Sequence, residues 1–133
     1  MTNGDSLKNC LEQYAAGVLS LDELENCLGS RARFRFWDSN ERSVELSMRL
    51  PKVVFSREDV DRQLQRFLNH QIDARELSDW AATLRLLDCF EVNEPDPGSS
   101  EIWDLIDELV SPDAWGPVTV DSVIDLRRRL ADV

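Results

Sequence analysis

The stretch FLNHQIDARELSDW, residues 67–80, decides the fold, because it has the pattern of a helix end, a tight connection and the start of a second helix. Asp73 and Glu76 have the spacing of a helix N-cap residue and the residue that reaches back to it. Apolar residues recur at helical spacing on both sides, from Val60 to Leu68 and from Leu77 to Leu87. The segment therefore predicts a helical hairpin, around which the other elements are arranged.

A second helical hairpin is predicted nearer the N-terminus. Ser20 and Glu23 repeat the cap pattern, and Gly17 stands where the preceding helix should end. A constant shift of 53 positions aligns the two hairpins at equivalent residues: Leu11 with Leu64, Tyr14 with Phe67, Gly17 with His70, Leu19 with Ile72, Glu23 with Glu76, Leu24 with Leu77 and Cys27 with Trp80. Duplication and convergence of two hairpins on one plan both account for the match.

Between the two hairpins the apolar period changes from about 3.6 to 2, which predicts a β-hairpin over about residues 33–50. Basic and aromatic residues alternate in its first strand: Arg33, Phe34, Arg35, Phe36 and Trp37. A polar turn at residues 38–40 precedes the second strand, which Pro51 ends, and residues 53–55 lead into the next helix. Such a strand could bind single-stranded nucleic acid, but the net charge of -11 favours aromatics on the core and arginines in solvent.

The C-terminal third is predicted to be helical. Residues 93–100, NEPDPGSS, have the composition of a loop. An apolar stripe follows: Ile102, Leu105, Ile106, Leu109 and Val110. Residues 111–117 should break this helix, with Trp115 against the core. Thr119 caps a last helix that carries the apolar residues Val120, Val123, Ile124 and Leu130.

Together these patterns predict an α+β fold that is mostly α: a bundle of about five to six helices with one β-hairpin, in a single domain spanning residues 1–133. No apolar run reaches the length of a membrane span, and the first residues lack the features of a secretory signal, so we expect a cytoplasmic protein. Cys10, Cys27 and Cys89 are odd in number and widely spaced, and we expect them to be reduced and mostly buried.

The excess negative charge lies in one block. Residues 86–126 contain eleven acidic residues and no lysine or arginine. Within it, Glu101, Asp104 and Glu108 share the outward face of the predicted helix. A field of this sign repels nucleic acid and anionic membranes, and it speeds association with basic proteins. Acidic helix faces also simply keep proteins soluble, so the charge does not decide a function.

The chain lacks the residue patterns of known catalytic and metal sites. His70 has no nearby Ser or Cys nucleophile, and its alignment with Gly17 favours a role in the turn. Neither an EF-hand, a zinc-ligand spacing nor a phosphate-binding glycine loop occurs. We therefore predict a protein without enzymatic activity, metal or cofactor, since an enzyme would need a polar pocket that the sequence does not indicate.

The segment from Val60 to Trp80, with its helix, short turn and ELSDWA, followed by an acidic helical half, resembles small helical immunity proteins of bacterial toxin systems. The colicin-D-like and contact-dependent-inhibition groups are the most similar. The likeness covers about half the chain, mainly Gln63 to Trp80 and more loosely Ile102 to Leu130. His70 stands where a glycine is more usual, and the hairpin at 33–50 has no counterpart.

The resemblance implies an acidic protein that neutralises a cognate toxin, often a basic nuclease, by protein–protein contact. The partner-binding residues would then be acidic side chains of the second half: Glu91, Glu94, Asp96, Glu101, Asp104, Asp107 and Glu108. An alternative is a non-catalytic adaptor or regulatory subunit that uses the same acidic surface for another partner. Neither nucleic acid nor membrane is expected as a partner.

Overall fold

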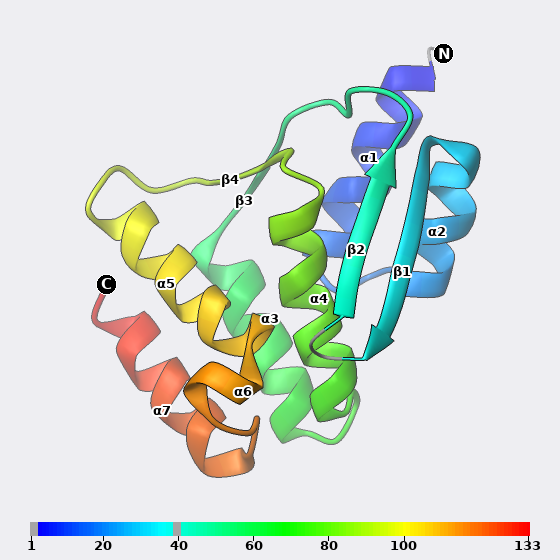
Figure 1. Ribbon diagram of the computed structural model, residues 1–133. Coiled ribbons are helices and arrows are strands. Elements are labelled where there is room, and N and C mark those ends of the chain that lie inside the picture. Colours follow the sequence, from blue (N-terminus) through cyan, green and yellow to red (C-terminus); the bar gives the residue numbers. More distant parts are fainter. Residues whose placement is uncertain (1–2, 39–40) are drawn as a thin grey trace.

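The computed structural model describes residues 3–38 and 41–133 and confirms a mostly helical α+β fold (Figure 1). Its elements, in chain order, are α1 Asn3–Ala15, α2 Leu21–Leu28, the 3-10 helix η1 Gly29–Arg31, β1 Ala32–Asp38, β2 Glu41–Leu46, β3 Val53–Phe55, α3 Arg57–Leu68, α4 Ala74–Leu86, β4 Phe90–Val92, α5 Gly98–Val110, α6 Pro112–Trp115 and α7 Val120–Ala131. The β1–β2 hairpin lies on one side against α2 and α4, while α5 and α7 lie on the other side (Figure 1).

The two helical hairpins, α1–α2 and α3–α4, close with the same turn. The N–H of Gly17 donates to the Tyr14 carbonyl at 3.0 Å, and the N–H of His70 donates to the Phe67 carbonyl at 3.1 Å. Both residues have positive φ, 82° at Gly17 and 61° at His70. The predicted caps are also present as reciprocal pairs, Ser20 with Glu23 and Asp73 with Glu76. These observations confirm that His70 is a turn residue.

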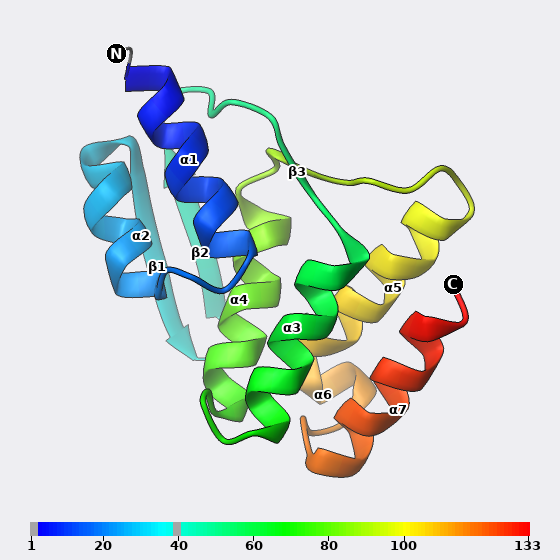
Figure 2. The same cartoon turned by 180° about the vertical axis from the view of Figure 1, so that it is seen from behind.

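The turn between α1 and α2 contacts α3, while the turn between α3 and α4 lies further down the molecule (Figure 2). Arg66 of α3 donates to the Gly17 carbonyl at 2.9 Å. Gly17 lies so close to α3 that a Cβ atom there would be 2.9 Å from Gln63 Oε1. The equivalent core residues are fully buried in both hairpins: Leu11, Leu24, Leu64 and Leu77. The hydrophobic core therefore includes residues of both hairpins, together with residues of α5 and α7 such as Ile106 and Val123.

The β-hairpin packs its aromatic side inward. Phe34 lies opposite Val44 in the antiparallel pair, and both pack against the core. Arg33 is exposed and Arg35 pairs with Glu45 at 3.5 Å, which agrees with the predicted orientation. Residues 39–40 of the predicted turn and the Trp37 side chain lie outside what the structure describes.

The second strand is shorter than predicted. It ends at Leu46 instead of Leu50, and the chain then bends away toward β3. Leu46 is 39% exposed and Met48 is 45% exposed. Leu46 lies opposite Ala32, whose small side chain covers little of it. The alternation of apolar residues predicted the strand itself. It did not show how far along the strand other parts of the chain cover its apolar face.

A second sheet was not predicted. Strands β3 and β4 form a short parallel pair, with Val53 beside Phe90 and Phe55 beside Val92. The α3–α4 hairpin is the connection between them. Each strand has three residues, too few for an alternating pattern to be recognised. Strand β4 leads from α4 to the loop before α5. The Phe55 ring of β3 packs edge-on against the Trp103 ring of α5, with 5.4 Å between the ring centres.

In the C-terminal segment the prediction for Trp115 is wrong, and the apolar residues predicted for the last helix are only partly buried. Trp115 is 63% exposed, because α6 is only four residues long, begins at Pro112 and ends at Gly116. In α7 the buried side chains are Val123, Leu126 and Leu130, while Val120 and Ile124 are 48% and 51% exposed. The apolar residues of α7 span more than one face, so their spacing did not identify the buried one. A smaller difference is that α5 begins at Gly98, inside the predicted loop.

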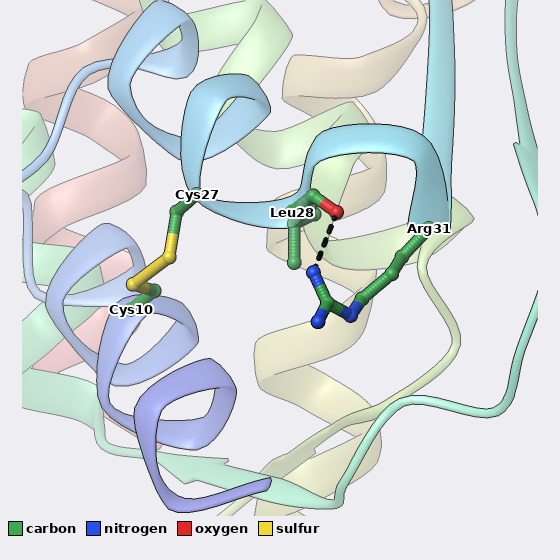
Figure 3. Close-up of a disulfide and its surroundings, with 4 residues drawn as sticks. All are labelled: Cys10, Cys27, Leu28 and Arg31. Carbon is green, nitrogen blue, oxygen red and sulfur yellow. Dashed lines mark hydrogen bonds between the residues drawn. A yellow bond between two sulfur atoms is a disulfide. The ribbon is translucent and has the colours of Figure 1, made fainter. Parts of the chain in front are cut away.

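The prediction of reduced cysteines is wrong for two of the three. Cys10 of α1 and Cys27 of α2 form a disulfide (Figure 3). The antiparallel packing of these helices brings together residues 17 positions apart, which sequence spacing does not reveal. Cys89 is free and buried, as expected, and burial raises its pKa to about 11, with a smaller effect of the Asp88 charge.

Candidate protein-binding surface

The acidic residues predicted to bind a partner are carried by β4, by the loop after it and by α5. Helix α5 is anchored by Ile102 and Ile106, which are completely buried. Its opposite face therefore points outward and carries carboxylates, with Glu101 and Asp104 exposed. α5 packs against α4 on one side and α7 on another (Figure 1).

Glu101, Asp104 and Glu108 line one shallow groove of about 240 Å³ between α5 and the C-terminal end of α7. Arg129 of α7 forms two hydrogen bonds with the Glu108 carboxylate, at 2.7 and 2.8 Å. These hydrogen bonds, and more weakly the Asp125 charge, raise the pKa of Arg129. In the described part of the chain, neither Glu101 nor Asp104 makes an ion pair. The structure thus confirms a shared face for the three residues and leaves two of them open to a partner.

Asp107 lies toward α4 instead of the groove. Arg85 donates two hydrogen bonds to its carboxylate, at 2.6 and 2.7 Å. The same guanidinium stacks 4.3 Å from the centre of the Trp103 ring. Hydrogen bonding to Asp107, followed by the charges of Asp107 and Asp104, raises the pKa of Arg85. A side chain held in this way serves the α4–α5 contact.

The remaining three predicted residues lie outside α5. Glu91 of β4 pairs with Lys52 at 2.7 Å, and both side chains are exposed. Glu94 pairs with Arg57 at the start of α3, at 3.2 Å. Asp96 accepts hydrogen bonds from Ser99 and Ser100, and these, Ser99 first, lower its pKa. None of these three lines the α5–α7 groove.

Four of the seven predicted residues therefore have basic partners from other parts of the chain: Glu91, Glu94, Asp107 and Glu108. Three of the four bases precede the acidic block in sequence, and one follows it. Folding thus neutralises part of the charge that the sequence concentrates in residues 86–126. Charge counts along the chain could not show this, because each pair joins residues that are distant in sequence and meet only in the folded structure.

A larger concavity of about 660 Å³ lies between α3 and α7 and is lined by arginines. Each of these has a carboxylate partner: Arg57 with Glu94, Arg62 with Asp59, Arg127 with Asp61 and Arg128 with Asp125. Arg127 lowers the pKa of Asp61 mainly through its hydrogen bond. Within the described residues, every arginine that lines this concavity is therefore paired with a carboxylate.

In the parts of the chain that the structure describes, no group of three or more His, Cys, Asp or Glu side chains is arranged to hold a metal ion. Nor does any described helix combine the length and apolar character that a membrane crossing requires.

No known protein-family model matches the chain, and neither a curated protein nor a solved structure matches it significantly.

Proposed function

We propose that the protein binds a basic protein partner and has no catalytic role. The observation that carries this proposal is the α5–α7 groove, in which Glu101 and Asp104 are exposed and make no ion pair in the described part of the chain. The net charge of -11 supports it, because that field attracts basic proteins before contact. Carboxylates on a rigid helix can then receive lysine or arginine side chains of the partner.

The more specific form of the proposal is an immunity protein that neutralises a bacterial toxin domain. It rests on the resemblance of Val60 to Trp80 to such proteins. A nuclease toxin carries basic residues for phosphates, and the α5 carboxylates would occupy those residues in place of a nucleic acid. Under this proposal the protein acts in the cytoplasm.

The alternative is an adaptor or regulatory subunit that uses the same carboxylates for a different basic partner. The gene neighbourhood separates the two: a large toxin gene immediately upstream favours immunity, and an operon of metabolic genes favours an adaptor. Co-expression with the neighbouring toxin gives a functional readout, because an immunity protein restores growth and an adaptor does not.

The double substitution Glu101→Lys/Asp104→Lys tests the surface. The partner is first co-purified from the native host and identified by mass spectrometry, and its association rate is then measured at low salt. We expect the variant to associate at least about ten-fold more slowly, because the groove changes sign. Glu108 is left unchanged, since replacing it would also remove two hydrogen bonds of Arg129.

Glu12→Lys/Asp22→Lys is the matched control, since it changes the net charge equally with exposed residues of α1 and α2. This control should slow association much less. Equal slowing by both variants would show that net charge acts without a local site, and an unchanged rate in the α5 variant would exclude the groove from the interface.

A further inference from the structure

A second surface lies at the other end of α7, beside the turn that joins α3 to α4. Val120 and Ile124 are one helical turn apart and about half exposed. Val120 also lines a groove of about 420 Å³ together with Phe67, Ile72 and Ala74 from the α3–α4 hairpin. Large apolar side chains gathered around a groove on a water-facing surface are typical of interaction sites.

The rim of this groove is negatively charged. Asp73 and Glu76 line it, and Asp121 follows Val120 on α7. Asp73 and Glu76 hydrogen-bond each other's backbone N–H groups at the start of α4, at 2.8 and 3.1 Å. Within the described residues, no lysine or arginine pairs with any of these three carboxylates. The groove therefore combines an apolar floor with an acidic edge that is not neutralised.

We propose that this groove binds an apolar side chain presented by a basic segment of a partner protein. The apolar side chain would cover Val120 and Phe67, and lysine or arginine residues next to it would pair with Asp73, Glu76 and Asp121. The proposal rests on the proposed function for the nature of the partner and adds a second contact to it. The two grooves lie about 14 Å apart along α7, from Val120 to Arg129, which one ordinary protein interface can span.

Charge decides against a second copy of this chain as the occupant. Two copies meeting at this groove would bring six carboxylates together, and each copy carries a net charge of -11. Like charges that face each other across an interface repel and weaken binding. The same carboxylates attract a basic segment, so the charge at the groove favours a basic partner over a second copy of this chain.

Two labelled lysine-rich peptides of equal charge test the proposal, one with central leucines and the other with serines in their place. Fluorescence anisotropy measures their binding to the intact protein. We expect the leucine peptide to bind at least about ten-fold more tightly, since one well-buried leucine supplies that difference. Val120→Ser should abolish the preference for the leucine peptide, because Val120 lines the groove.

Val54→Ser is the matched control, because Val54 of β3 is 54% exposed and does not line the groove. It should leave the preference intact. Equal binding of both peptides to the unaltered protein, or equal loss in the control, would overturn the proposal. So would a dimer that Val120→Ser disperses in sedimentation, since the groove would then belong to a second copy.

The experiments distinguish failure of the groove proposal from failure of the proposed function. Glu101→Lys/Asp104→Lys should weaken both peptides alike and leave their ratio unchanged, because it acts at the other end of α7. Suppose that the unaltered protein shows no preference for the leucine peptide, while Glu101→Lys/Asp104→Lys still slows association with the native partner. This result would overturn the proposal for this groove and leave the proposed function standing. A leucine preference in a protein that binds no basic partner in its host would remove the proposed function instead.

Discussion

At the scale of single residues, Arg42 attaches the β-hairpin to the helices. Its side chain is only 4% exposed and lies 2.9 Å from Asp79. It also donates to Ser78 Oγ at 2.8 Å and to the Val110 carbonyl at 3.0 Å, so it joins β2 to both α4 and α5. The hydroxyl of Ser78 in turn donates to the Leu109 carbonyl at 2.7 Å. The helix that carries the candidate binding residues is therefore positioned partly by one buried guanidinium.

Arg42→Ala should lower the free energy of unfolding by about 3 kcal/mol, because it leaves a buried carbonyl and part of a buried ion pair without their donor. Urea unfolding followed by circular dichroism measures this. Arg35→Ala is the control, since the Arg35–Glu45 pair is exposed and should contribute about 0.5 kcal/mol or less. Similar losses in the two variants would show that the Arg42 network does not hold the hairpin in place.

Residue-scale features divide into those the sequence predicts and those it does not. The outward face of Glu101, Asp104 and Glu108 followed from helical spacing, because their neighbours Ile102 and Ile106 must be buried. The pairing of Glu108 with Arg129 could not be predicted, since it depends on how α7 packs against α5. Local spacing determines which way a side chain points, whereas packing between distant elements determines whether its charge remains unpaired.

At the scale of elements, the turns after α1 and α3 are a matched pair with different residues at the position of positive φ. Gly17→Ala should destabilise the protein by about 1–2 kcal/mol, because a Cβ is unfavourable at φ 82° and would lie 2.9 Å from Gln63 Oε1. His70→Gly should stabilise it by up to about 1 kcal/mol. His70 has a Cβ atom at a φ of 61°, which is unfavourable, and glycine adopts this conformation without that strain. The midpoint temperature of thermal unfolding should therefore fall for Gly17→Ala and rise for His70→Gly. Shifts of the same sign would contradict an equivalent role of the two residues in their turns.

Elements with their own caps and apolar period were predicted correctly, as the four helices of the two hairpins show. Elements that exist only through distant contacts were not. The β3–β4 pair forms because α3 and α4 return the chain to its starting point, which no local pattern encodes. Exposure of Trp115 has a similar origin, since α6 has no long apolar face to bury.

At the scale of the whole molecule, the two hairpins are stabilised by different means at one equivalent position. The shift that aligns Gly17 with His70 places Cys27 over Trp80 and Cys10 over Gln63. Trp80 and Gln63 are almost completely buried and belong to the α3–α4 hairpin. The α1–α2 hairpin has a covalent bond there, between half-buried cysteines. Its helix α2 has only eight residues, and the disulfide links it covalently to α1.

Reduction of this disulfide should therefore lower the free energy of unfolding by about 3 kcal/mol, the loss expected for opening a loop of this size. In the cytoplasm the thiols would be reduced, and the buried faces of Leu11 and Leu24 would have to keep α1 and α2 in place. Urea unfolding with and without dithiothreitol measures the loss, and Cys10→Ser/Cys27→Ser should reproduce it and respond to the reductant no further. Cys89→Ala keeps the disulfide, so it should retain the full response. If the unaltered protein unfolds at the same urea concentration in both conditions, packing supports the first hairpin as fully as it supports the second.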